Sequence, residues 1–165
     1  WTCPKSIIEL REGMTFLDLS VRQIEHPNGT FNVNVPFILM NSFNTDDDTA
    51  RVIQKYANHN VEIMTFNQSR YPRLNRHTLL PCPRSATSYK NLWYPPGHGD
   101  LFVAMHNSGL LDSLLAMGKE YVFVSNVDNL GAVVDLNIYQ HMIDTQAEFI
   151  SEVTDKTKAM SRAVR

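Results

Sequence analysis

The sequence predicts an α/β fold in which helices cover a mostly parallel sheet. Along the chain, the period of the apolar residues changes repeatedly between that of a strand and that of a helix. Several strand-like runs are short and uniformly apolar, which is typical of strands that are buried on both faces of a parallel sheet. The 165 residues, of which 43% are apolar and 19% are charged, have the composition of one globular domain.

The N-terminal part of the chain begins this alternation with a short strand and a helix. Residues 7–10 are apolar enough to form the candidate strand. Leu17, Val21 and Ile24 then recur at the i, i+4, i+7 spacing of one helix face.

A second strand, helix and strand follow. The run 37–40 comes directly after Pro36 and predicts a buried strand. Thr45, with Asp48 three residues later, resembles a capping box, so a helix that reaches Tyr56 is expected to begin there. Residues 61–66 predict the next strand.

The second half of the chain is less regular. Residues 69–96 carry five of the eight prolines without a clear period, which indicates an extended surface excursion. After a further helix, 121–124 reads as a buried strand, and an apolar stripe predicts a helix over 132–143. Residues 148–153 are the expected last strand. The resulting order, β-α-β-α-β-loop-α-β-α-β, favours a parallel, helix-covered sheet.

Composition excludes several classes of partner and chemistry. A net charge of −2 and a pI near 6.3 argue against nucleic acid or an anionic membrane as partner. The apolar runs are too short to span a bilayer. The two cysteines lack metal-site spacing and cannot make a disulfide framework, and no signal peptide is evident, so a cytoplasmic location is expected. The sequence contains no GxGxxG fingerprint, Ser-His-Asp elbow pattern or Cys/His cluster.

Two motifs in the second half are candidates for a ligand site. Residues 95–99, Pro-Pro-Gly-His-Gly, combine fixed proline φ angles with permissive glycines and place His98 in a stiff loop. An ordinary turn with a structural histidine is the alternative. Asn126 and Asp128 directly follow the apolar run 121–124, where a carboxylate suits Mg²⁺. A strand-ending Asx turn explains that pattern equally well.

Further candidates lie near the N-terminus and at other strand ends. Lys5, in Pro-Lys-Ser, has the point charge that binds a phosphate, although a surface lysine is the default interpretation. Gln68 follows a predicted strand, where its amide would read a base edge or simply lie in an exposed polar loop. Asn41 and Asn44 follow a third strand. Because the carboxyl ends of parallel strands form the usual ligand site of open α/β sheets, these positions support one another.

Five motifs together resemble eukaryotic UTP–glucose-1-phosphate uridylyltransferases, also called UDP-glucose pyrophosphorylases. The similarity extends from about Cys3 to about Thr157, and the motifs occur in the family's order and spacing. They are Cys-Pro-Lys-Ser at 3–6, Met-Asn-Ser-Phe-Asn-Thr at 40–45, Phe-Asn-Gln-Ser-Arg-Tyr-Pro-Arg at 66–73, Trp-Tyr-Pro-Pro-Gly-His-Gly-Asp at 93–100, and Gly-Lys-Glu-Tyr-Val-Phe-Val-Ser-Asn-Val-Asp-Asn-Leu-Gly at 118–131.

The resemblance implies a Rossmann-like, GT-A type catalytic domain with three α/β/α layers. It also implies a reaction in which UTP and glucose 1-phosphate give UDP-glucose and pyrophosphate with Mg²⁺. The residue roles that it implies are as follows: Lys5 neutralises the nucleotide phosphates, Gln68 and Gly97 hold the uracil with Met40 nearby, His98 lies near the nucleotide and the sugar phosphate, Asn126 contacts the nucleotide sugar region, and Asp128 holds the metal.

Departures from the family pattern indicate that residues 1–165 are an incomplete catalytic domain. The family's glycine-rich loop would precede Pro4, but only three residues stand there, and Cys3 replaces the usual glycine. The sugar-binding segments, a second catalytic lysine and the C-terminal β-helix domain are expected to be missing. We therefore expect weak or no catalysis from this chain alone, and self-association through exposed sheet edges. The alternatives are a non-catalytic nucleotide-binding or interaction module derived from such an enzyme, and a gene fragment without independent biology.

Overall fold

A computed structural model of the protein describes residues 4–83, 85 and 89–155. The chain divides into two compact units, of which the first ends at Ala132 and the second begins at Val133. The candidate site residues all lie in the first unit. Cys3, with the two residues before it, and residues 156–165, where the family similarity ends, lie outside the described ranges.

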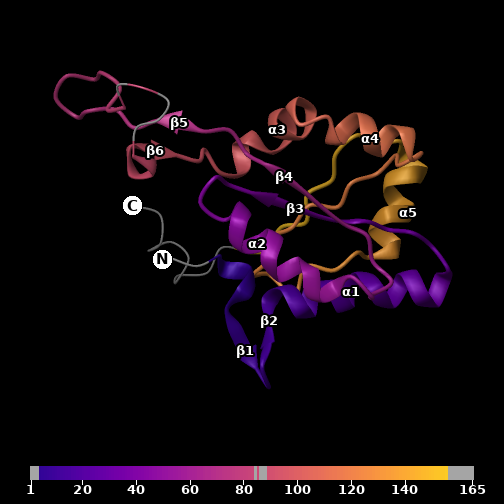
Figure 1. Ribbon diagram of the computed structural model, residues 1–165. Coiled ribbons are helices and arrows are strands. Elements are labelled where there is room, and N and C mark those ends of the chain that lie inside the picture. The colour runs from indigo at the N-terminus through magenta and orange to yellow at the C-terminus, as the bar shows by residue number, and fades with distance from the viewer. Residues whose placement is uncertain (1–3, 84, 86–88, 156–165) are drawn as a thin grey trace. The chain divides into compact units, whose positions relative to one another are not determined.

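The centre of the first unit is a parallel pair of strands, β3 (Phe37–Asn41) and β4 (Ile63–Asn67), drawn in Figure 1. The pair is in register from Phe37 opposite Ile63 to Asn41 opposite Asn67. Both strands were predicted from the sequence, over 37–40 and 61–66, and both predictions are confirmed. Because the strands are parallel, their two terminal asparagines lie at the same edge of the sheet, where ligands bind in α/β folds.

Helices cover both faces of this strand pair (Figure 1). Alternate residues of a strand point to opposite faces. Because residues 37–40 of β3 are all apolar, the strand contributes apolar side chains to the clusters on both faces. One cluster has Leu17, Val21 and Tyr56 as its buried members, with Phe37, Leu39 and Ile63 packed against them. The other has Phe66, Ala104, Met105, Leu110 and Leu114, with Ile38, Met40 and Met64 packed against them.

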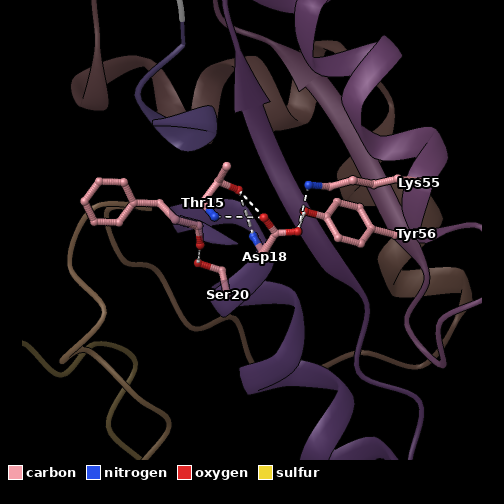
Figure 2. Close-up of polar contacts among 6 residues, drawn as sticks. Thr15, Asp18, Ser20, Lys55 and Tyr56 are labelled. Atoms are coloured by element: carbon pink, nitrogen blue, oxygen red, sulfur yellow. Dashed lines mark hydrogen bonds and ion pairs between the residues drawn. The ribbon is translucent and has the colours of Figure 1, made fainter. Parts of the chain in front are cut away.

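The first cluster belongs to helix α1 (Phe16–Phe31), which confirms the helix predicted from the spacing of its apolar residues. A capping box begins this helix, because the Thr15 side chain accepts from the Asp18 N–H and Asp18 accepts from the Thr15 N–H. The Asp18 carboxylate also accepts hydrogen bonds from the Tyr56 hydroxyl at 2.8 Å and from Lys55 Nζ at 2.7 Å (Figure 2). One carboxylate thus joins the start of α1 to a segment almost forty residues away.

The capping box expected at Thr45 is absent. Helix α2 (Asp46–Val52) does begin after Thr45 and continues into the 3₁₀ turn η2 (Ile53–Tyr56), but no side chain caps it. The Thr45 hydroxyl instead accepts from the Ser42 N–H at 3.1 Å, because a tight turn brings residue 42 within its reach. Both Thr15 and Thr45 have an aspartate three residues later, but only Thr15 forms a capping box.

The N-terminal segment also differs from its prediction. Residues 7–10 were expected to form a strand of the parallel sheet, but the segment begins as a 3₁₀ turn, η1 (Lys5–Ile7). Strand β1 (Glu9–Arg11) follows and pairs antiparallel with β2 (Met14–Thr15). Glu12 and Gly13 between them both have positive φ, 54° and 74°. That two-residue turn favours a local hairpin over a crossover to the sheet.

The excursion predicted over 69–96 carries a short antiparallel ribbon. Its strands are β5 (Tyr71–Pro72) and β6 (Trp93–Tyr94), with the 3₁₀ turn η3 (Lys90–Leu92) before β6. The chain then enters η4 (His98–Asp100), α3 (Leu101–Asn107) and α4 (Leu110–Ala116). The single helix expected here is divided at Gly109, which has a φ of 75°.

Two expected strands are wrong for the described residues. Neither 121–124 nor 148–153 is a strand. In the first of these runs all four side chains are exposed, from 40% for Tyr121 to 54% for Val124. An apolar run predicts burial, but a strand also needs a neighbour to complete its ladder of hydrogen bonds. Within the described residues, parallel pairing is confined to β3 and β4, so the broad parallel sheet is not present there.

The second unit contains helix α5 (Leu136–Thr145), which is capped by Asp135 accepting from the Asn137 N–H at 2.7 Å. The helix was expected from residue 132 but begins four residues later, where this cap satisfies its first N–H groups. Leu136, Tyr139 and Ile143, which belong to the apolar stripe that predicted this helix, are 62%, 39% and 38% exposed. No helix in the described ranges is long and apolar enough to cross a bilayer.

Candidate functional site

Two loops are joined by hydrogen bonds beyond the carboxyl ends of β3 and β4. The Gln68 N–H donates to the Asn41 carbonyl at 3.0 Å, which continues the strand pairing by one residue. The Gln68 side chain then reaches the second loop, where its Oε1 accepts from the Gly97 N–H at 2.7 Å. No described residue accepts from its Nε2, so this amide can donate two hydrogen bonds to a ligand.

A second hydrogen bond joins the same two loops, and in this bond the first loop provides the donor and the second loop the acceptor. The Ser69 N–H donates to the Asp100 carboxylate at 2.6 Å, and Asp100 is only 6% exposed. Within its own loop, the Asp100 N–H donates to the Gly97 carbonyl at 3.1 Å. Sequence reasoning included Asp100 in a motif but assigned it no role. The sequence feature that could have indicated a role for Asp100 is its place at the end of a stiff loop that contains proline and glycine.

Gly97 has a backbone conformation that other residues rarely adopt, with φ 85° and ψ −152°. This region is accessible to glycine because a Cβ is missing. It turns the Gly97 N–H toward Gln68 while His98 begins η4 as an exposed side chain. The glycine expected to give the loop its flexibility therefore fixes one particular shape.

Replacing Gly97 with alanine is expected to lower the free energy of unfolding by about 1–3 kcal/mol, because the strain persists even with open space around the new Cβ. The Gly99→Ala variant is the matched control, since Gly99 has no positive φ and equally open space. Urea unfolding of both variants measures the difference. Equal stability of the two variants would contradict the conformational argument.

Lys5 and Asp128 meet although 123 positions separate them in the sequence. Lys5 Nζ lies 3.2 Å from Asp128 Oδ2, and the two side chains are 70% and 36% exposed. Asp128 belongs to a turn in which the Asn129 N–H donates to the Asn126 carbonyl at 3.0 Å. Helix α1 holds this turn through Gln23, whose Nε2 donates to the Leu130 carbonyl at 2.9 Å. A cation and a carboxylate thus share one accessible position.

The donor set at Asp128 suits a metal that is shared with a phosphate ligand. The described residues include no group of three His, Cys, Asp or Glu side chains arranged to hold a metal ion. Mg²⁺, however, commonly binds one or two carboxylates and takes its other ligands from phosphate oxygens and water. The solvent-accessible Asp128 supplies the one carboxylate that this requires, and it does not fit a metal held by protein groups alone.

The remaining candidates lie near these pairs without a contact that tests their roles. Asn126 is exposed and begins the turn that carries Asp128. Met40 lies one residue before Asn41 in β3, but its side chain packs against the cluster around Phe66. The contacts of Met40, His98 and Asn126 with a ligand therefore stay predictions.

An open surface depression of about 370 Å³ adjoins the 97–99 loop. Its walls combine aromatic, apolar and carboxylate groups, contributed by Tyr71, Tyr94, Pro96, Gly99, Asp100 and Val103.

Comparison with known proteins agrees with the motifs. The sequence profile of the family described as UTP–glucose-1-phosphate uridylyltransferase matches residues 1–163. A probable UTP–glucose-1-phosphate uridylyltransferase from Schizosaccharomyces pombe is 67% identical over 156 residues, which are 94% of this chain and 31% of the relative. The Solanum tuberosum UTP–glucose-1-phosphate uridylyltransferase is 59% identical over 96% of this chain and 33% of its own length.

Solved structures show the same relationship. A UDP-glucose pyrophosphorylase mutant from Leishmania major, in complex with UDP-glucose, matches with a TM-score of 0.83 and 32% identity over 96% of this chain and 34% of that one. A UDP-glucose phosphorylase from Trypanosoma brucei matches with a TM-score of 0.77 and 37% identity, covering 88% of this chain and 32% of that one. The chain spans about a third of the length of these relatives, and it belongs to the UTP–glucose-1-phosphate uridylyltransferase family.

Proposed function

We propose that this chain forms the nucleotide-binding part of a uridylyltransferase that converts UTP and glucose 1-phosphate into UDP-glucose and pyrophosphate. The observation that carries this proposal is the pairing of Lys5 with Asp128 at 3.2 Å, in a member of this family. A cation and a possible metal ligand in one accessible place suit a ligand that carries several phosphates.

The loop pair supports the base side of this proposal. The Gln68 Oε1 accepts from Gly97, so its Nε2 is the group left to face a ligand. An amide N–H₂ donates to a carbonyl such as those of uracil, and it cannot pair with the exocyclic amine of cytosine. The proposed uracil site therefore consists of Gln68 and Gly97, with Met40 nearby.

The phosphate side relies on Lys5 and Asp128. In the proposed reaction, a phosphate oxygen of glucose 1-phosphate forms a bond to the α-phosphorus of UTP, and the bond from that phosphorus to pyrophosphate breaks. Bound Mg²⁺ would neutralise phosphate charge, with Asp128 as its protein ligand. Lys5 would neutralise further charge, His98 would lie near the reacting phosphates, and Asn126 would orient the nucleotide sugar. Positioning and charge are the main requirements of such a transfer.

The proposed architecture is a Rossmann-like, GT-A type catalytic domain with three layers. Its support is the parallel β3–β4 pair with helices packed on both faces. Relatives about three times as long have room for the neighbouring strands of a wider sheet. We also propose a cytoplasmic setting, in keeping with Cys82, which is a free cysteine.

A chimera tests the proposed function. In the Schizosaccharomyces pombe relative, the matching segment is replaced by the corresponding residues of this chain. We expect UDP-glucose formation from UTP in this chimera, and none when the segment is deleted. The isolated chain is expected to bind UTP without turnover, as a nucleotide-binding module would. An inactive but folded chimera would overturn the proposal.

The Gln68→Ala variant of the chimera is expected to raise the KM for UTP about tenfold, because one hydrogen-bonding side chain is lost from the proposed base site. Gln54→Ala is the matched control, since Gln54 is an exposed glutamine whose bond stays within its own segment. Steady-state kinetics with varied UTP measures both. An unchanged KM in the Gln68 variant would remove this residue from the base site.

A further inference from the structure

We propose that Asp100 is a positioning residue, which sets the place of Gly97 and His98 relative to Gln68 and thereby shapes the nucleotide site. The inference rests on the proposed function and adds a residue to it. Its basis is a reciprocal arrangement, in which each loop supplies one side-chain acceptor and one backbone donor to the other. Gln68 accepts from the Gly97 N–H at 2.7 Å, and Asp100 accepts from the Ser69 N–H at 2.6 Å.

The position of Asp100 shows that this contact replaces a more ordinary one. Asp100 is the N-cap residue of α3, where an aspartate usually accepts from an N–H of its own helix. Here the side chain makes no such bond and reaches the other loop, 31 residues away in the sequence. The 3₁₀ turn η4 runs directly into α3, and its His98 carbonyl already accepts from the Leu101 N–H, so the Asp100 carboxylate is left to join the two loops.

Burial makes the contact stiff. Asp100 is 6% exposed, and a carboxylate removed from water keeps its partners because an unpaired buried charge is costly. Directly after Asp100, helix α3 packs Ala104 and Met105 into the cluster that contains Phe66 of β4. The carboxylate thus ties the Gly97 loop to the end of β4 at the point where the loop joins the core.

Two hydrogen bonds in opposite directions constrain the relative position of the loops more than one bond does. The β5–β6 pairing and the Gln68–Gly97 bond already join the two segments, but neither holds the backbone between Gln68 and Tyr71. With the Asp100–Ser69 bond added, the backbone on both sides of the Gln68 amide is held. A ligand then meets a preformed arrangement and loses less free energy to ordering the loops.

Hydrogen exchange tests the contact in this chain without any nucleotide. Exchange of the Ser69 and Gly97 amides is expected to accelerate about tenfold or more in Asp100→Ala. The Asp100→Asn variant keeps an oxygen acceptor, so it should restore part of the protection and covers the case in which the alanine variant fails to fold. The control is Asp112→Ala, an exposed aspartate on α4. Unchanged exchange at Ser69 in both Asp100 variants would overturn the inference.

Kinetics of the chimera test the consequence for the site. Asp100→Ala is expected to raise the KM for UTP about tenfold, while kcat and the KM for glucose 1-phosphate change less than about threefold. Asp100→Asn should recover most of the affinity for UTP. A fall in kcat with an unchanged KM for UTP would overturn the positioning role. An unmodified chimera without activity would overturn the proposed function instead, and hydrogen exchange would still decide whether Asp100 holds the loops.

Discussion

Replacing Asp128 with alanine is expected to lower kcat/KM of the chimera by about 100-fold or more, while leaving its folding stability almost unchanged. The expected loss follows from the value of a well-placed electrostatic group, since removing one such group costs about 2.7–4 kcal/mol of transition-state stabilisation. Asp128 is also the proposed metal ligand. Lys5→Met, which removes the charge and keeps most of the side-chain length, is expected to cause a loss of similar size.

Asp128→Ala and Lys5→Met are expected to lose catalytic activity without losing folding stability. Lys5 and Asp128 are 70% and 36% exposed, and an ion pair this accessible contributes roughly 0–1 kcal/mol. A second exposed pair provides the matched control. Arg51 and Asp48 lie 3.7 Å apart with side chains 78% and 38% exposed, but they lie outside the proposed site.

Steady-state kinetics and urea unfolding of Asp128→Ala, Lys5→Met and Asp48→Ala measure both effects. We expect all three proteins to retain similar unfolding free energies and only Asp48→Ala to retain activity. Should Asp128→Ala keep more than a third of the parent activity, the assignment of Asp128 to the phosphate side is wrong.

The sequence predicted the central layer of the fold well, because local pattern determines it. The runs at 37–40 and 61–66 are short and rich in apolar residues, and they became β3 and β4. Leu17 and Val21 were placed on one face of a helix, and both are fully buried in α1. Each of these predictions requires only neighbours within a few residues.

Predictions that depend on distant partners failed more often. Residues 121–124 have the composition of a buried strand, but the described structure does not include them in a strand. Thr45 and Thr15 carry similar local signals for a helix cap, and the geometry of the preceding turn decided which one forms it. The local pattern of residues shows neither whether a strand finds a partner nor how the turn before a helix is shaped.

The candidate site shows the same division. Gln68 and Gly97 were singled out separately, and the structure joins them. The meeting of Lys5 with Asp128 follows from the packing of η1 and the 126–131 turn along α1, which no spacing in the sequence reveals. Asp100 was included in a motif without a role, because no spacing in the sequence shows that its carboxylate reaches the Ser69 N–H.

The second large effect is expected at Asp18, where Asp18→Ala should lower the free energy of unfolding by about 3–4 kcal/mol. Its carboxylate accepts from the Thr15 N–H at 2.8 Å, the Thr15 hydroxyl at 2.7 Å and the Tyr56 hydroxyl at 2.8 Å (Figure 2). Hydrogen bonds to a charged group contribute about 1.5–3 kcal/mol each and are not additive. Lys55 adds less, because it is 46% exposed.

Urea unfolding of this chain measures that loss, and two further variants divide it. Thr15→Ala removes the cap and should cost about 1 kcal/mol. Tyr56→Phe removes one hydroxyl from the carboxylate and should cost about 1–2 kcal/mol. Asp47→Ala, at an exposed aspartate in the first turn of α2, is the control for loss of a carboxylate at a helix start. A loss at Asp18 no larger than at Asp47 would show that the network contributes nothing beyond the helix dipole.

The pH dependence of stability provides an independent test of the same carboxylate. Burial acts to raise the pKa of Asp18, but hydrogen bonds from Lys55, Thr15 and Tyr56 outweigh it and hold that pKa far below its usual value. Because the folded-state pKa is lowered, the contribution of Asp18 is complete above its unfolded pKa of about 3.9 and is lost as pH falls through and below that value.

The unfolding free energy of the parent chain should therefore decline between about pH 5 and pH 2, more steeply than that of Asp18→Asn. Glu25, whose pKa is lowered by its hydrogen bond with His59, is present in both proteins, so the difference between the two curves isolates Asp18. Parallel curves for the two proteins would mean that Asp18 titrates alike in the folded and unfolded states, and the network would then lose its electrostatic basis.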